Sequence, residues 1–348
     1  MEKEIGSEFW DAPVAEVTNN LFPDSVQWFL SGRSALRAIV RELKGCHTVA
    51  MPSWCCDSMI APFEKEGMTV VFYPVCPSKA GLVQEIRLDC DVLFLMDYFG
   101  YAASPVDLSG YNGTIIRDVT HSAFSQSHFG ADYCFGSLRK WCGVWTGGFA
   151  WAKDGHSLRG DGGDARTYVS LREEAMRQKA VYINQSDSCT DDGEIGKDYL
   201  RLYAEAEKFL EDCPITSGTE RDALIAKRLD VDYIRTRRRE NAQILMKAFQ
   251  EQLIFPRLGE QDCPLFVPIL VSDGQRDALR QFLIRQRIYC PVHWPIDKQS
   301  EARHGTLYEG EISLVCDQRY TKNDMNRIVT TVREFWREQR RAQGLYTG

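Results

Sequence analysis

The fold of this chain is decided by Cys134-Phe135-Gly136-Ser137-Leu138-Arg139-Lys140-Trp141, an apolar strand that runs into a short turn carrying a lysine. Upstream, Arg117-Asp118-Val119-Thr120-His121 places an acid at the end of another apolar strand. Parallel strands gather their carboxyl ends at one edge of a sheet, where loops and helix starts form a binding crevice. We therefore expect Asp118 and Lys140 to meet at that edge.

Short apolar strands alternate with helical patterns on either side of this stretch. Strands are predicted at residues 48–51, 69–73, 91–96, 114–117, 132–135 and 148–152, and helices at 33–44 and 54–66. The strands at 91–96 and 114–117 are largely apolar runs, which is typical of strands covered on both faces. This alternation predicts an α/β protein with a mostly parallel sheet.

The second half of the chain has a different texture. A glycine- and aspartate-rich loop at 154–164 and a polar loop at 184–196 accompany helical patterns at 199–211 and 221–252. Beyond residue 254, strands are predicted at 265–271 and 311–315, and helices at 275–286 and 324–341. We predict a large domain over residues 1–245 that includes an N-terminal arm, and a small α+β domain over residues 246–348.

Composition and charge exclude several classes of function. The 348 residues carry a formal net charge of −7, so we expect neither nucleic acid nor a membrane as a partner. No stretch approaches the roughly 20 apolar residues of a membrane span, and the first residues lack the apolar core of a secretory signal. The 12 cysteines form no CxxC pair and the six histidines lack zinc-ligand spacing. These counts predict a cytoplasmic protein with reduced thiols and no metal site.

Lys140 and Asp118 have the chemistry that pyridoxal phosphate requires. A lysine amine forms a Schiff base with the aldehyde of this cofactor, while an acid keeps the pyridine nitrogen protonated so that the ring accepts electrons from the substrate. We expect the apolar neighbours Leu138 and Trp141 to desolvate the Lys140 amine.

A phosphate site is predicted where Ser137 meets the helix that starts at Ser31-Gly32-Arg33-Ser34-Ala35-Leu36. Free backbone N–H groups at a helix start attract an anion and a glycine lets it approach, which makes binding candidates of Gly32, Arg33 and Ser34. The alternative is a plain helix cap, because serine is a preferred N-cap residue. Arg139 either joins the phosphate site or forms a surface ion pair.

Four further residues are candidates for the site, and each has a structural alternative. His121 either orients the Asp118 carboxylate and stacks beside the cofactor ring, or is an ordinary structural histidine. Trp54 either covers the ring or packs in the core. His293 either reaches a substrate from the small domain or belongs to a turn built by its flanking prolines. Asn184 is predicted in a loop that crosses to a partner subunit.

These residues resemble those of the DegT/DnrJ/StrS family of pyridoxal-phosphate-dependent aminotransferases, which have fold type I of the aspartate aminotransferase superfamily. The resemblance covers nearly the whole chain, with matching segments at 31–36, 51–54, 97–100, 117–121 and 311–314 in addition to Lys140. It implies a three-layer α/β/α domain with a mostly parallel sheet and a smaller C-terminal α+β domain. It also implies a Schiff base at Lys140, an Asp118 that contacts the pyridine nitrogen, and a homodimer with its sites at the subunit interface.

The chain departs from the family pattern at three points. The family's phosphate-binding serine lies five residues before the lysine, where this chain has Phe135. The ring-stacking aromatic residue of the family stands where this chain has Cys56, so we place both Trp54 and Cys56 beside the cofactor. The glycine-tyrosine-asparagine-tyrosine segment that a neighbouring subunit contributes is not found. These departures imply a divergent branch.

The sequence leads to one principal hypothesis and two alternatives. The principal one is an aminotransferase with Lys140, Asp118 and His121 as catalytic residues, which by resemblance transfers an amino group from glutamate or glutamine to a keto sugar or related keto metabolite. The same cofactor also supports elimination, replacement or cyclisation, which is the second hypothesis. The third is a non-catalytic protein on the same scaffold.

Overall fold

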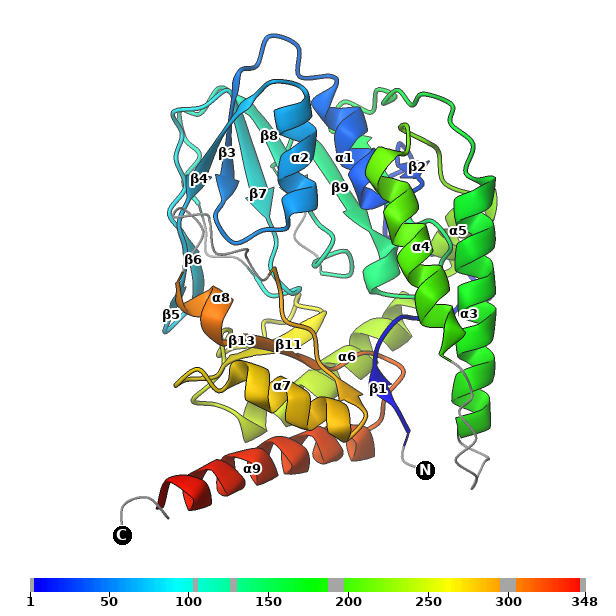
Figure 1. The fold of residues 1–348 in the computed structure, drawn as a ribbon. Coiled ribbons are helices and arrows are strands. Elements are labelled where there is room, and N and C mark those ends of the chain that lie inside the picture. The colour runs from blue at the N-terminus through cyan, green and yellow to red at the C-terminus, as the bar shows by residue number, and fades with distance from the viewer. Residues whose placement is uncertain (1–2, 103–105, 126–129, 187–196, 295–304, 345–348) are drawn as a thin grey trace.

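A seven-stranded sheet forms the centre of the molecule (Figure 1). The computed structural model describes residues 3–102, 106–125, 130–186, 197–294 and 305–344. Five neighbouring strands are parallel, and β10 is antiparallel to both β9 and β2 at one end. In spatial order the strands are β2 (Gln27–Phe29), β10 (Gly148–Ala152), β9 (Tyr133–Ser137), β8 (Thr114–Asp118), β7 (Val92–Met96), β3 (Thr48–Pro52) and β4 (Thr69–Tyr73).

Helices cover both faces of this sheet, because successive side chains of each strand point to opposite faces. Ala150 of β10 belongs to the core on the face of α1 (Gly32–Val40) and α2 (Asp57–Lys65). Its neighbour Phe149 belongs to a second core with Ala226 of α5 (Glu220–Arg228). The predicted α/β class with a mostly parallel sheet is therefore confirmed.

The smaller C-terminal elements pack around a two-stranded antiparallel sheet of β11 (Phe266–Leu270) and β13 (Glu311–Val315). Around it lie α7 (Arg276–Arg285), α8 (Thr306–Gly310) and α9 (Lys322–Gly344). The helix α6 (Val231–Ala248) packs against both α9 and β11. Since α6 crosses the predicted boundary between residues 245 and 246, that boundary stays a prediction.

Several predicted bounds were wrong. The predicted helix at 221–252 is two helices, α5 and α6, because the Asp230 side chain accepts the N–H of Tyr233 and starts a new helix. The α1 helix ends at Val40 and α2 begins at Asp57, three residues later than predicted. Asn184 lies in the last turn of α3 (Arg166–Ser186), not in a loop, and α3 packs on α4 (Asp198–Asp212). Residues 187–196 of the predicted loop lie outside the described residues.

Five short strands of the described residues had no counterpart in the sequence prediction, one of them the edge strand β2 of the large sheet. β5 (Val75–Ser78) and β6 (Gly81–Gln84) form a hairpin. β1 (Ile5–Gly6) pairs with β12 (Ile288–Tyr289), which attaches the N-terminal arm to the C-terminal elements. The arm is also held by a fully buried ion pair, because Lys179 Nζ on α3 donates to the Glu4 carboxylate.

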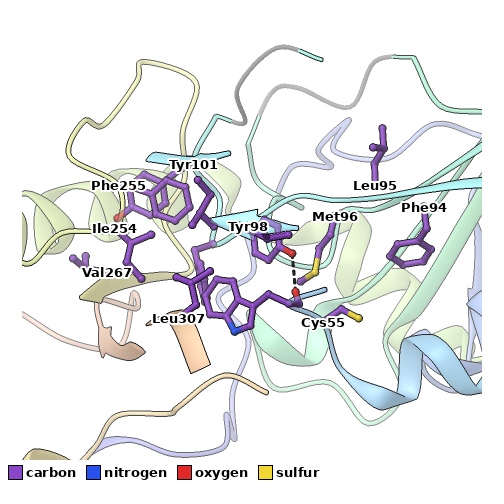
Figure 2. Packing of buried hydrophobic residues seen from close by; sticks show 14 of the residues in the cluster. Cys55, Phe94, Leu95, Met96, Tyr98, Tyr101, Ile254, Phe255, Val267 and Leu307 are labelled. Atoms are coloured by element: carbon purple, nitrogen blue, oxygen red, sulfur yellow. Dashed lines mark hydrogen bonds between the residues drawn. The ribbon is translucent and has the colours of Figure 1, made fainter. Parts of the chain in front are cut away.

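Aromatic stacking joins the large sheet to the C-terminal elements (Figure 2). The ring of Tyr101 stacks on Phe255 with centroids 4.5 Å apart and an interplanar angle of 3°. Gly100, which precedes Tyr101 in the chain, has a φ of 79°, and a Cβ there would lie 1.9 Å from the carbonyl oxygen of Cys263. Only glycine fits this position, so the chain path after β7 depends on it.

Two further properties of the described residues concern membrane spans and cysteine pairing. None of the helices in these ranges is both long enough and apolar enough to cross a membrane. The cysteines of the same ranges are free thiols, and most of them are buried.

Candidate active site

A cavity of about 670 Å³ lies at the carboxyl ends of β8 and β9. Its walls come from the N-terminal arm, the start of α1, the ends of these strands, α4 and the C-terminal elements. Its volume falls within the roughly 300–1,000 Å³ of small-molecule sites. Eight residues predicted from the sequence line it, namely Gly32, Arg33, Cys56, Asp118, His121, Ser137, Lys140 and His293.

Asp118 is a buried carboxylate at the end of β8, only 1% exposed. Burial raises its pKa to about 6, although hydrogen bonds from Thr120 oppose this shift. One of these bonds runs from the Thr120 backbone N–H to Asp118 Oδ1 at 2.8 Å. A buried carboxylate of this kind is costly until a cation lies beside it. Asp118 is therefore suited to a cationic partner in the cavity.

Lys140 ends the single helical turn η1 (Leu138–Lys140) that follows β9, and its side chain is exposed in the cavity. The expectation that Leu138 and Trp141 desolvate the amine was wrong. Both side chains are fully buried in the core behind the turn, where the Trp141 ring packs on Phe124 with centroids 4.7 Å apart. The Lys140 amine is thus left free to meet a ligand.

His121 is buried in the cavity wall among aromatic rings, with its ring centroid 5.0 Å from that of Phe99. Burial, together with repulsion from His293 and Lys140, lowers the pKa of His121 well below its ordinary value. Its Nδ1 accepts the backbone N–H of Phe99 at 3.4 Å. The ring is therefore neutral at physiological pH, with its proton on Nε2.

Trp294 is a site residue that the sequence did not indicate. It lines the cavity, and its ring is nearly parallel to that of His121, with centroids 5.6 Å apart and an angle of 15°. Its φ of 49° lies in the left-handed region, a conformation that costs a bulky residue about 1–3 kcal/mol and that clusters at functional sites.

His293 reaches the cavity from the segment that follows β12. Its backbone N–H donates to Glu311 Oε2 at 2.8 Å, and its Nδ1 lies 3.0 Å from Ser313 Oγ. Its ring centroid is 5.6 Å from that of His121. The buried Glu311 and Ser313 of β13 hold the imidazole in place, so His293 is a well-supported and largely buried residue of the cavity wall.

The start of α1 and the end of β9 form a small polar cradle. Ser31 Oγ accepts the backbone N–H of Ser34 at 3.2 Å, so Ser31 is the cap of the helix. Ser34 does not line the cavity. Gly32 does line it, and a Cβ there would lie 3.5 Å from Ser137 Cβ. Ser137 is 8% exposed, and its Oγ has no hydrogen-bond partner among the described residues. A buried hydroxyl without a partner is expected to bind a ligand atom.

Two arginines flank this cradle and share one carboxylate. Arg33 Nη2 lies 3.3 Å from Glu207 Oε2, and Arg139 Nη1 donates to Glu207 Oε1. Glu207 comes from α4, and no signal in the sequence links it to residues 33 and 139. Arg139 therefore forms an ion pair, but with a carboxylate that lines the cavity rather than with one on the outer surface, so a place in the phosphate site stays a prediction.

Besides Ser34, two predicted site residues, Trp54 and Asn184, do not line the cavity, whereas Cys56 does. Trp54 is fully buried, stacks on Tyr98 with centroids 5.3 Å apart, and is not among the cavity-lining residues. Its core-packing alternative therefore holds. Cys56 lines the cavity at the N-cap of α2. Asn184 is exposed on α3 and does not line the cavity.

The chemistry of the cavity suits an organic anion better than a metal ion. Within the described ranges, no group of three or more His, Cys, Asp or Glu side chains is arranged to hold a metal. The cradle instead offers a hydroxyl, a helix start and cations, which are the groups that bind phosphate. Next to it, Asp118 and Lys140 supply the acid and the amine.

Comparison with known proteins gives the same architecture. No family model matches the chain, and no curated protein matches it in sequence. Among solved structures, PseC from Helicobacter pylori, an aminotransferase of pseudoaminic acid biosynthesis, is 14% identical over 94% of this chain and 99% of its own, with a TM-score of 0.56. DesV from S. venezuelae, solved with a ketimine intermediate, is 15% identical over 89% and 84%, with a TM-score of 0.57.

A DegT DnrJ EryC1 StrS aminotransferase from Brucella abortus is 16% identical over 89% of this chain and 85% of its own, with a TM-score of 0.55. At such low identity the likeness establishes the fold. The chain therefore has the fold of these aminotransferases, and the resemblance inferred from its motifs is confirmed at that level.

Proposed function

We propose that this chain is a pyridoxal-phosphate-dependent aminotransferase whose donor is glutamate or glutamine and whose acceptor is a keto sugar or related keto metabolite. The observation that carries the proposal is that Asp118 and Lys140, from the ends of neighbouring strands, open with Ser137 into one cavity. CalS13 from Micromonospora echinospora, a sugar aminotransferase that shares the fold, supports the class of acceptor.

The residues of the cavity fit this cofactor. Ser137 Oγ and the N–H groups at the start of α1 are the groups to hold its phosphate. Asp118, whose pKa is raised to about 6 by burial, gains a charged partner in the ring nitrogen and keeps that nitrogen protonated. The Lys140 amine would hold the aldehyde carbon.

The bound cofactor supplies an electron sink, which makes the proton on the amino-bearing carbon of the substrate removable. Lys140 Nζ would take that proton and return it at the neighbouring carbon as a general acid and base. His121, neutral with its proton on Nε2, offers a hydrogen-bond donor at the cavity wall. His293 faces the substrate side.

Hydride trapping tests the assignment of Lys140. The full-length chain is incubated with pyridoxal phosphate, reduced with borohydride and digested, and the mass of each lysine peptide is measured. We expect the pyridoxyl group on Lys140, no adduct in Lys140→Ala, and an unchanged adduct in the control Lys153→Ala, which removes an exposed lysine outside the cavity. An adduct on another lysine, or on none, contradicts the assignment.

The reaction type needs a second measurement. Glutamate or glutamine added to the loaded protein should convert the cofactor to its pyridoxamine form, which changes the absorbance spectrum. Elimination or replacement yields products without that conversion, and a non-catalytic protein remains colourless and unlabelled. We further propose that the chain is a homodimer with its sites at the interface, which sedimentation equilibrium tests.

A further inference from the structure

Glu207 is an anion that the chain itself inserts between two cations of the cradle. It lies on α4, whereas Arg33 lies on α1 and Arg139 on the turn after β9. All three line the cavity together with Ser137. Each arginine bonds to a different oxygen of the same carboxylate.

The Glu207 carboxylate is charged and partly exposed. Burial opposes the ionisation of Glu207, but Arg139 and then Arg33 outweigh it and hold the pKa of this carboxyl at about 2. Its side chain keeps 42% of its surface exposed, whereas that of Arg139 keeps 17%. The arginine is therefore fixed in the wall, while the carboxylate has a path to solvent.

The arginines also retain unused capacity to donate. Arg139 Nε is buried without a hydrogen-bond partner among the described residues, as is the nearby Ser137 Oγ. A guanidinium donates through five N–H groups and binds the oxygens of a phosphate more strongly than those of a neutral ligand. A phosphate dianion offers three acceptor oxygens to these donors and carries more charge than a carboxylate.

We propose that Arg33 and Arg139 form the cationic wall of the phosphate site, and that Glu207 is an internal counter-ion which an incoming phosphate monoester displaces. The inference rests on the proposed function and names the residues that complete its phosphate site within one chain. It accounts for the chain's lack of the segment that the resembling family borrows from a neighbouring subunit. Without ligand, Glu207 keeps two like charges from repelling each other, and with ligand it gives way.

The proposal predicts effects of opposite sign at the two ends of the ion pair. Glu207→Gln removes the competitor, so its affinity for inorganic phosphate and for pyridoxal phosphate should rise roughly tenfold. Arg139→Gln removes a charge-assisted donor, so both affinities should fall by roughly 10- to 100-fold. Pyridoxal, which lacks the phosphate, should bind all variants equally. The matched control is Glu205→Gln, which breaks an exposed ion pair with Arg201 on the same helix.

Calorimetric titration of the full-length chain, purified without added cofactor, measures the affinity for inorganic phosphate at constant ionic strength. Absorbance titration measures pyridoxal phosphate and pyridoxal. If Glu207→Gln weakens phosphate binding as Arg139→Gln does, Glu207 orients the arginines and the displacement proposal is wrong. Equal affinities in all variants also overturn it.

Failure of the proposed function looks different. In that case no variant forms a borohydride-stable adduct at Lys140, while the inorganic phosphate titration still reports whether the arginines and Glu207 compete. Should Glu207→Gln fail to fold without ligand, thermal unfolding with increasing phosphate provides a second readout. Phosphate should then raise its melting temperature more than that of Glu205→Gln, and an equal rise contradicts the proposal.

Discussion

Replacing Asp118 by asparagine should stabilise the cofactor-free protein while abolishing its function. In the folded chain this carboxylate is 1% exposed, and burial raises its pKa to about 6. An asparagine keeps the shape and an oxygen to accept the Thr120 N–H, but carries no charge to desolvate. The buried Asp118 carboxylate therefore lowers the free energy of unfolding of the cofactor-free protein.

The size and sign of the cost follow from proton linkage. A folded pKa of about 6 against an ordinary 3.8 corresponds to about 3 kcal/mol. Below pH 4 both states of the chain hold the proton and the term vanishes. Between pH 4 and 6 the unfolded state loses its proton first, so stability falls as pH rises. Above pH 6 the full cost remains.

Urea unfolding of cofactor-free wild type and Asp118→Asn at pH 4.5 and pH 8 measures this difference. We expect Asp118→Asn to be more stable by up to about 3 kcal/mol at pH 8 and by much less at pH 4.5. The control Asp97→Asn should lose stability, because Asp97 accepts from Arg117 at 3.1 Å and from Ser122 at 2.5 Å. An Asp118→Asn variant that is less stable than wild type at pH 8 would refute the reasoning.

Two other substitutions probe the framework that shapes the cavity. Glu4→Gln leaves the buried Lys179 ammonium without its anion and should lower the free energy of unfolding in urea by about 3–5 kcal/mol at pH 7. The loss should be smaller at alkaline pH, where the lysine deprotonates. An unchanged unfolding midpoint would mean that this ion pair does not hold the arm. Gly100→Ala should lower the melting temperature steeply, because its Cβ would lie 1.9 Å from the Cys263 carbonyl oxygen. The control Gly45→Ala has open space around its Cβ. It should lose only the free energy of its strained left-handed backbone, about 1–2 kcal/mol.

The sheet could be predicted from the sequence because its strands are short apolar runs between turn signals. The bounds of β4, β10 and β13 match the predicted ranges. Helix bounds were less accessible, because a helical period continues across a break. The patterns of α5 and α6 run on as one, but the extended Leu229, which forms a bridge with Val14, and the Asp230 side chain, which caps α6, separate them.

The candidate site was predictable where the topology of the sheet sets it. Asp118 and Lys140 follow neighbouring parallel strands, so their convergence is a consequence of strand order. Glu207 and Trp294 were not predictable, because they come from elements whose packing on this edge leaves no local pattern. Trp54 was misplaced for a related reason, since its proximity to Pro52 does not determine which way the ring turns.

Two departures from the pattern of the resembling family, at Cys56 and Phe135, each have a candidate substitute among the residues that line the cavity. Cys56 stands in place of the stacking aromatic residue, and Trp294 reaches the same cavity from the C-terminal side and lies parallel to His121. Phe135 stands in place of the usual serine, and Ser137, two residues on, has the unpartnered hydroxyl. A site that loses a contact on one element can regain it from another, provided both elements face the same cavity. The low sequence identity to proteins of this fold is thus compatible with a retained chemistry, because binding depends on which groups line the cavity rather than on where they stand in the chain.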